Sequence, residues 1–275
     1  MRAISILGCL WVALFALPAA AAPMTIPLKP YVARLVTVDA IIDGKPARLL
    51  LDTGGGISSI TPQFAASIGC VPRGRIAAFR MSGERVGFGK CGRRGLSLGG
   101  YATPMDLAVY DLSAVLPPEL PPLDGVLSLD AFVGRAITVD LSGRVIVVET
   151  PRSLARTIAG ASEGAMRLQR EAGGAGLSVF IRARAEAGDI WLLADSGNLA
   201  EIQLSRGALE QFAPHAQSPD ASFTFRLAVD GLPAADSSAE VKDLIYDGAL
   251  NERFFAAHRI TFDLQRSRIW FAPAR

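Results

Sequence analysis

Cysteine and histidine are scarce in this chain: its 275 residues include three cysteines and two histidines. Cys9 lies in an apolar stretch near the N-terminus, which leaves Cys70 and Cys91 in the rest of the chain. His215 and His258 lie far in sequence from both cysteines and from each other. Zinc needs several such ligands together, and a nucleophilic triad needs a histidine beside its serine or cysteine. The sequence therefore predicts no metal, no cofactor and no histidine-activated nucleophile.

The chain also lacks an excess of charge of one sign, because 28 lysine and arginine residues nearly balance 26 aspartate and glutamate residues. The arginines are scattered, and aromatic residues, 7% of the chain, do not interleave with them. A nucleic-acid or anionic-membrane partner would require a basic patch. We therefore expect neither partner.

Long hydrophobic runs are confined to the N-terminus. Arg2 precedes an apolar stretch, 3–17, and a run of alanines, 19–22, follows it. This is the layout of a signal peptide, and the stretch is shorter than the roughly 20 residues that span a bilayer. We expect residues 1–22 to be removed and the protein to be periplasmic or secreted, with no membrane span afterwards. In an exported protein, Cys70 and Cys91 predict a disulfide rather than a metal site.

An internal repeat is the most informative feature that is present. Residues 124–141 recur as 247–264, and both copies read Asp-Gly-apolar-apolar, then Phe, then Ile-Thr-apolar-Asp-Leu. Every matched pair is 123 residues apart, as Asp124 and Asp247 are. Chance can match two or three residues but hardly so many at one spacing, so the sequence predicts two similar halves.

A second pair of segments lies upstream of these copies. Residues 49–54 read Leu-Leu-Leu-Asp-Thr-Gly, and residues 192–197 read Leu-Leu-Ala-Asp-Ser-Gly. They are 143 residues apart, so the region between the two landmarks is 20 residues shorter in the second half. Each Asp turn follows an apolar hairpin, and the first hairpin has Asp43-Gly44 as its turn signal.

Each half continues with a helix signal and further strands. Thr61-Pro62 is a cap and first-turn pair with Gly69 as the stop, and Ser205 caps residues 206–212. The predicted class is all-β with a few short helices. We expect a first lobe at 23–150, a linker at 151–176 and a second lobe at 177–275.

The repeated aspartates suggest a chemistry. Asp52 and Asp195, if brought within hydrogen-bond reach, cannot both ionise cheaply, so the pair holds one acid and one base at once. Such a pair can activate water against an amide carbonyl without a metal. Glycine at the second place after each aspartate permits a close backbone approach. Thr53 and Ser196 can hydrogen-bond across the pair.

These motifs resemble those of the pepsin and retropepsin-like aspartic peptidases, in particular bacterial exported members with two retropepsin-like lobes in one chain. The likeness covers about 28–150 and 177–272. It implies a bilobal fold with a β-barrel in each lobe, which acts as a monomer on a peptide or protein substrate. The implied site has two catalytic and four supporting residues: Asp52 and Asp195, with Thr53, Gly54, Ser196 and Gly197.

The resemblance also implies a flap, a hairpin that covers the bound peptide. We expect it at 76–88, with Ser82, Gly83 and Glu84 at the tip. Phe79, Met81 and Val86 are the residues that we expect to touch substrate. Cys70 and Cys91 bracket this hairpin, so their disulfide would tie its base.

Three positions differ from the family pattern. The residue after each apolar pair is Ser128 in the first half and Asn251 in the second, where glycine is usual. Asp130 is replaced by Arg253 in the second half. Gly55 and Asn198 stand where pepsins carry serine or threonine.

Three functions fit these observations to different extents. An endopeptidase explains both intact aspartates. A peptide- or protein-binding module on the same duplicated fold is the alternative, since the second lobe is the more degenerate. An exported β-sandwich adhesin or carbohydrate binder explains the strands but not the paired triplets.

Overall fold

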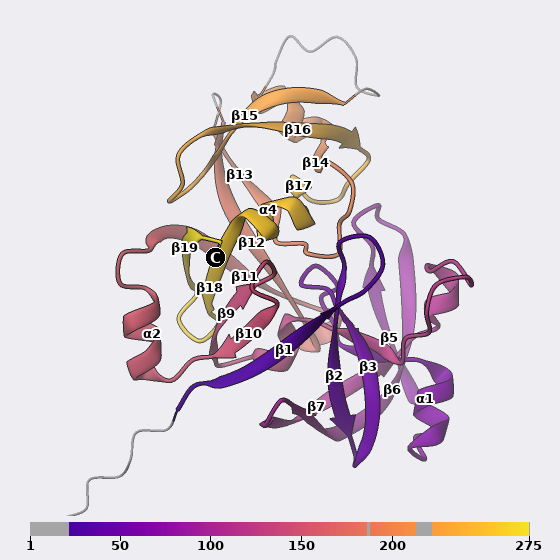
Figure 1. Ribbon diagram of the computed structural model, residues 1–275. Coiled ribbons are helices and arrows are strands. Elements are labelled where there is room, and N and C mark those ends of the chain that lie inside the picture. The colour runs from indigo at the N-terminus through magenta and orange to yellow at the C-terminus, as the bar shows by residue number, and fades with distance from the viewer. Residues whose placement is uncertain (1–21, 186–187, 213–221, 275) are drawn as a thin grey trace, which may run out of the picture.

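The computed structural model describes residues 22–185, 188–212 and 222–274. The predicted signal peptide, apart from Ala22, and His215 lie outside these residues. The structure is mainly β and confirms the predicted fold class: two lobes, each built around a small barrel, lie side by side (Figure 1). In the described part of the chain, no helix is long and apolar enough to cross a membrane.

The first lobe follows the predicted order of strands and helices. Its elements are β2 (Val36–Ile42), β3 (Lys45–Leu51), β4 (Ser59–Ile60), α1 (Pro62–Ser67), β5 (Arg73–Phe79), β6 (Arg85–Leu98), β7 (Tyr101–Val109), η1 (Leu112–Ala114), β8 (Gly125–Leu127) and η2 (Leu129–Phe132). Asp43 and Gly44 have φ of 48° and 83°, which is the tight turn that joins β2 and β3. Thr61 accepts a hydrogen bond from Phe64 N and begins α1, and Gly69 has φ 66° just after its end.

The second lobe repeats this order in shorter form. Its elements are β12 (Gly176–Ala185), β13 (Gly188–Leu193), β14 (Ile202–Ser205), α3 (Arg206–Phe212), β15 (Phe223–Val229), β16 (Ala235–Lys242), β17 (Gly248–Ala249) and α4 (Glu252–Ala257). The hydroxyl of Ser205 accepts a hydrogen bond from Ala208 N, as its predicted capping role requires.

A six-stranded antiparallel sheet joins the lobes. Its order is β1, β10, β9, β18, β19 and β11, made of β1 (Met24–Pro30), β9 (Ala136–Asp140), β10 (Val145–Val148), β11 (Ser162–Glu171), β18 (His258–Asp263) and β19 (Arg268–Pro273). β9 and β18, the two copies of the repeat, pair at its centre, where Thr138 lies opposite Thr261. Their hydroxyl oxygens are 2.9 Å apart. Because these residues are 123 positions apart, an approximate dyad passes between them.

The repeated Asp-Gly pair serves the fold. Asp124 accepts a hydrogen bond from Arg48 N, and Asp247 accepts one from Trp191 N, each at 2.8 Å. A side chain at Gly125 would overlap the backbone of Ser59, so glycine is needed where β4 and β8 pair. These contacts hold β8 beside β3, and β17 beside β13, in parallel.

Residues 151–176 were expected to be a linker, but they contain sheet. After α2 (Pro151–Thr157), β11 pairs with β19 in the joining sheet and with β12 of the second lobe, and η3 (Ala172–Gly174) follows. Met166 is the one fully buried residue in β11, so apolar residues do not alternate clearly along it. The missing alternation explains why the sequence did not reveal this strand.

Candidate active site

The two Asp turns follow β3 and β13 and meet between the lobes. β8 fixes the first turn, because Asp52 N donates to Leu127 O at 3.0 Å. β17 fixes the second, because Leu250 N donates to Leu193 O at 2.9 Å. The apolar pairs of the repeat therefore lie directly behind the turns, as the resemblance implies.

Thr53 and Ser196 link the turns across the lobe boundary. Ser196 N donates to Thr53 Oγ1 at 2.9 Å, and Thr53 N donates to Ser196 Oγ at 3.1 Å. Thr53 Oγ1 also donates to Ala194 O at 2.7 Å. Both side chains are buried, so their polar groups depend on these partners. The predicted cross-pair hydrogen bonds are present.

The glycines of the triplets make room for the opposite carboxyl group. A side chain at Gly54 would come within 2.6 Å of Asp195 Oδ1, and one at Gly197 within 2.8 Å of Asp52 Oδ1. Each aspartate also accepts from its own triplet: Gly54 N donates to Asp52 Oδ1 at 2.9 Å, and Gly197 N to Asp195 Oδ1 at 2.8 Å. The carboxyl groups of Asp52 and Asp195 share a side-chain hydrogen bond.

Burial raises the pKa of both carboxyl groups above the ordinary aspartate value. The pKa of Asp195 rises the more, because the charge of Asp52 adds to its burial and the shared hydrogen bond favours its protonated form. For Asp52, that same bond and backbone donors oppose the effect of burial on the pKa. Asp195 is therefore the carboxyl group that retains the shared proton, and Asp52 is the one that ionises first.

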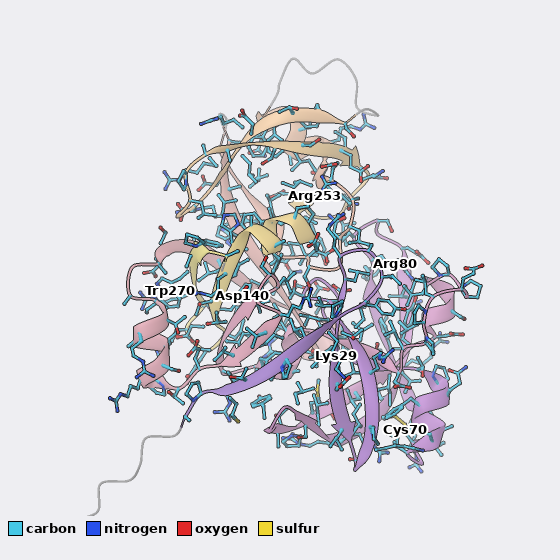
Figure 2. All side chains as sticks on the ribbon, viewed as in Figure 1. Lys29, Cys70, Arg80, Asp140, Arg253 and Trp270 are labelled. Carbon is cyan, nitrogen blue, oxygen red and sulfur yellow. A yellow bond between two sulfur atoms is a disulfide. The ribbon has the colours of Figure 1, made fainter. Side chains whose placement is uncertain are left out.

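A cavity of about 390 Å³ opens beside Asp52, whereas Asp195 does not line it. Asp52, Gly54 and Gly197 lie at its floor, and the predicted flap residues Phe79, Met81 and Val86 line it from above. Arg80 lies on this flap, and Arg253 lies on the second lobe (Figure 2). The flap hairpin is formed by β5 and the start of β6, as predicted.

The tip of the flap contacts the second lobe. Gly83 has φ 82°, a conformation that favours glycine, and a side chain there would lie 3.1 Å from Ile245 Cγ2. Ile245 N donates to Met81 O at 2.8 Å. Ser82 accepts a hydrogen bond from Glu84 N within the turn. The cavity is therefore roofed by the flap in this structure.

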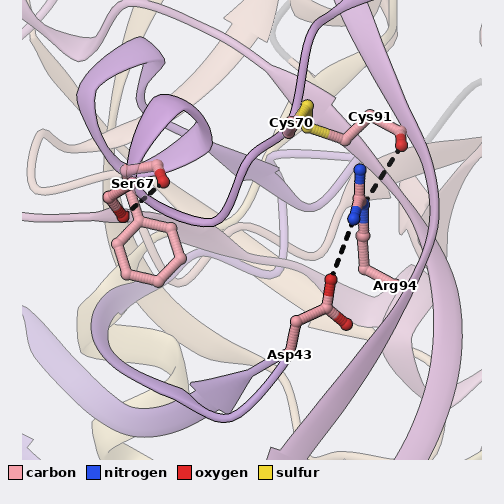
Figure 3. The surroundings of a disulfide bond; sticks show 6 residues. Asp43, Ser67, Cys70, Cys91 and Arg94 are labelled. Atoms are coloured by element: carbon pink, nitrogen blue, oxygen red, sulfur yellow. Dashed lines mark hydrogen bonds and ion pairs between the residues drawn. A yellow bond between two sulfur atoms is a disulfide. The ribbon is translucent and has the colours of Figure 1, made fainter.

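The predicted disulfide is formed between Cys70, after α1, and Cys91 in β6 (Figure 3). Arg94 lies beside it and joins Cys91 O, at 3.2 Å from Nε, to Asp43 Oδ2, at 3.0 Å from Nη1. These contacts bring the hairpin turn, the end of α1 and the lower part of the flap strand together. The disulfide thus lies at the base of the flap.

Asp130 and Arg253 occupy matched positions in the two lobes, and each pairs with a residue of its own lobe. Ser58 donates through N and Oγ to the carboxylate of Asp130, and burial raises the pKa of Asp130 to about 6. In the second lobe, Arg253 Nη1 lies 2.9 Å from Glu201 Oε1. Glu201 and Ser58 are 143 residues apart and so occupy matched positions, and both members of the pair differ between the lobes. The offset of 143 is the sequence signal that points to Ser58 and Glu201.

Gly55 and Asn198 stand where pepsins carry serine or threonine, and neither donates a side-chain hydrogen bond to the adjacent aspartate. Asn198 N donates to Asp195 Oδ1 at 3.1 Å, but the Asn198 side chain is used by the backbone at Glu201, Leu250 and Ala200. Gly55 lies against Asp52 without a side chain. Among the described residues, backbone N–H groups and the partner aspartate are the donors to the pair.

The cavity also includes two polar residues that the sequence reasoning missed, Glu171 and Tyr246. Glu171 ends β11, the strand that was expected to be a linker. Tyr246 lies in a short loop before β17, next to Asp247 of the repeat. Neither position stands out by local sequence pattern.

Comparisons with known proteins support the fold. A scan against protein-family models and a search of curated protein sequences found no match. Among solved structures, the chain is similar to basic 7S globulin from soybean, with a TM-score of 0.55 and 10% sequence identity. The similarity covers 91% of this chain and 94% of that one. The chain therefore has a pepsin-like bilobal fold.

Proposed function

We propose that this protein is an aspartic endopeptidase that hydrolyses peptide bonds with a water molecule activated between Asp52 and Asp195. The observation that carries the proposal is the close approach of one carboxyl group from each lobe, beside a roofed cavity that Asp52, Gly54 and Gly197 line. Two coupled carboxyl groups with raised pKa values are the arrangement that supplies an acid and a base together.

The reaction needs no group outside the chain, the substrate and water. Water attacks the amide carbonyl carbon while its proton passes to ionised Asp52, and the proton of Asp195 passes to the carbonyl oxygen. In the resulting tetrahedral intermediate, the proton on Asp52 passes to the amide nitrogen. The C–N bond breaks, Asp195 recovers a proton from one hydroxyl, and the pair returns to its starting state.

The flap and the lobes supply binding and exclusion of water. Extended peptides bind sheet edges through backbone hydrogen bonds and through pockets for alternate side chains. The flap closes from above, which lowers the local dielectric around the pair. Both half-sites lie in one chain, so the proposed active unit is a monomer. Export to the periplasm or the medium remains part of this proposal, and the disulfide fits it.

A non-catalytic peptide-binding module is the second candidate. One observation favours it: the usual hydroxyl donors beside the pair are replaced by Gly55 and by an Asn198 side chain that points to the backbone. The same cavity and flap would then hold a peptide without cutting it.

Cleavage of a mixed peptide library separates the two candidates. Purified wild type, Asp52→Asn and Asp195→Asn are incubated with the library from acidic to neutral pH, and products are identified by mass spectrometry. Exposed Asp106→Asn is the matched control. We expect wild type and the control to cut the same bonds and both active-site variants to cut none. If wild type produces no cleavage that both active-site variants lack, the peptidase proposal fails.

A further inference from the structure

Few charged side chains line the cavity, and they differ in whether another residue neutralises their charge. Among the described residues that line it, Asp52, Arg80 and Glu171 carry charge. Arg80 is matched within the flap, because its Nε lies 3.0 Å from Glu84 Oε2 and its Nη2 donates to Tyr110 at 2.6 Å. Glu171 makes no ion pair with any other residue that the structure describes. Its negative charge is therefore available to a ligand.

Tyr246 holds the carboxylate of Glu171 in place. Its hydroxyl donates to Glu171 Oε1 at 2.7 Å. The Tyr246 ring packs edge-on against Phe180, with centroids 5.0 Å apart, and against the cluster that contains Leu193. Leu193 is two residues before Asp195, so this wall of the cavity leads directly to the catalytic pair. Burial and the charge of Glu171 raise the pKa of Tyr246, which keeps its phenol a proton donor.

The turn that carries Glu171 is fixed against the first lobe. Ala172 and Ala175 pack on the small cluster of Ile57 and Ile76 at the base of the flap. Leu177 N donates to Gly56 O at 2.6 Å, three residues beyond Thr53. The carboxylate is thus part of a rigid wall and has little freedom to swing out to solvent.

A fixed carboxylate in a mainly apolar cavity favours a cationic group and repels an anionic one, while the one cation in the lining, Arg80, is already paired with Glu84. We propose that Glu171, positioned by Tyr246, is a specificity-determining residue that selects peptides with lysine or arginine at the subsite it faces. The inference rests on the proposed function, since it names the substrate class of the same cleft. It adds a charge preference that the aspartate pair alone does not impose.

The test compares peptides that differ only in charge. Acetylated and amidated peptides based on one cleaved sequence carry lysine, its uncharged analogue norleucine, or glutamate at each position in turn. The kcat/KM ratio of lysine to norleucine is measured for wild type, Glu171→Gln, Glu171→Lys and Tyr246→Phe. Glu210→Gln, on the exposed face of α3, is the matched control. The affinity of the same peptides for Asp52→Asn is measured by fluorescence anisotropy, which needs no cleavage.

At one position we expect wild type and Glu210→Gln to prefer lysine by roughly tenfold, the usual size of one charge-assisted hydrogen bond. The ratio should approach one in Glu171→Gln and invert towards glutamate in Glu171→Lys. Tyr246→Phe should give a smaller preference, because the charge stays but its orientation is lost. The Asp52→Asn variant should show the same preference in binding.

Equal treatment of lysine and norleucine at every position, or a lysine preference that survives in Glu171→Gln, overturns the inference and leaves the peptidase proposal standing. If no peptide is cut but Asp52→Asn still binds lysine peptides more tightly, the peptidase proposal fails and the charge selection stands. If no peptide is cut and Asp52→Asn binds the two peptides equally or not at all, both fail.

Discussion

At the scale of single residues, the buried hydroxyl of Thr53 links the two lobes. It donates to Ala194 O and accepts from Ser196 N, so one buried group satisfies two backbone groups of the opposite lobe. Threonine and valine have nearly the same shape, but valine cannot form either bond. The substitution therefore isolates the hydrogen bonds from the packing.

Thr53→Val should lower the free energy of unfolding by roughly 2 to 4 kcal/mol, because it leaves a buried N–H and a buried C=O without partners. Chemical denaturation measures this change. Exposed Thr25→Val is the matched control, with an expected change of less than about 0.5 kcal/mol. Equal effects of the two substitutions would show that the cross-lobe bonds contribute little.

Asp130 makes the stability depend on pH. Its pKa is about 6 in the folded protein against 3.8 ordinarily, mainly through burial, so the folded chain holds this proton more tightly than the unfolded chain does. The stabilising contribution is therefore present at pH below 3.8 and is lost as the pH rises from there through about 6. The loss amounts to about 3 kcal/mol.

Asp130→Asn, which stays neutral, should remove this part of the pH dependence. We expect the free energy of unfolding of the variant to fall less than that of wild type between about pH 4 and about pH 7. The Asp52–Asp195 pair changes stability in the same direction in both proteins, so the difference between the two curves is the informative quantity. Parallel curves would mean that Asp130 titrates normally.

At the scale of elements, the flap is the feature that distinguishes the lobes. Ser59 pairs with Ala108 in the first lobe, and Ile202 pairs with Ala239 in the second. The matched residues are therefore 143 positions apart at β4 and β14 but 131 positions apart at β7 and β16. This separation falls again to 123 at β8 and β17. The 20 residues that the second half lacks thus correspond to the flap hairpin, between β4 and β7, and to part of the segment 110–124, between β7 and β8. Residues of both segments, such as Phe79 and Leu112, line the cavity.

The disulfide should stabilise this asymmetric lobe. It closes a loop of 21 residues, and chain-entropy estimates for such a loop give about 3 kcal/mol. The double variant Cys70→Ser, Cys91→Ser should unfold at lower denaturant concentration than wild type. Reductant should destabilise wild type by a similar amount and leave the double variant unchanged. An effect of reductant on the double variant would contradict this account.

The sequence predicted the elements that carry strong local signals. The Asp43-Gly44 turn, the cap at Thr61 and the paired triplets each follow from residue type and spacing, and the structure has them in place. β11 was missed because nearly all of its side chains are exposed or half-exposed and lack alternation. Glu171 and Tyr246 were missed for a related reason: the tertiary fold brings them together across 75 residues, and no local pattern marks them.

At the scale of the whole molecule, the lobes are joined by the dyad-related sheet and by side-chain contacts. Arg34, in the turn between β1 and β2, pairs with Glu252 at the start of α4 and donates to Leu199 O at 3.2 Å. Glu252 is 3% exposed, so its carboxylate depends on this partner from the other lobe. The duplication could be read from the sequence, whereas this cross-lobe pair could not. Arg34 lies outside the repeat, and Glu252 lies within it at a position that does not match, because Leu129 is its counterpart.

Arg34→Ala should lower the free energy of unfolding by about 3 kcal/mol, since it leaves a buried carboxylate unpaired. Adding Glu252→Gln should restore most of the loss. A double-mutant cycle by chemical denaturation measures the coupling. Additive effects of the two substitutions would contradict an interlobe ion pair.

The central claim is that the two lobes bring Asp52 and Asp195 together so that they share one proton. Carbon NMR of the protein with labelled aspartate carboxyl groups tests it directly at about pH 5.5, above the ordinary aspartate pKa. We expect a carboxyl carbon of the pair to keep the chemical shift of a neutral acid while exposed aspartates are ionised. Asp130, whose pKa burial raises to about 6, gives a second such signal. We expect the signal of the pair to be absent in Asp195→Asn and the signal of Asp130 to be absent only in Asp130→Asn. Two carboxyl groups that titrate independently near the ordinary aspartate pKa would contradict the account.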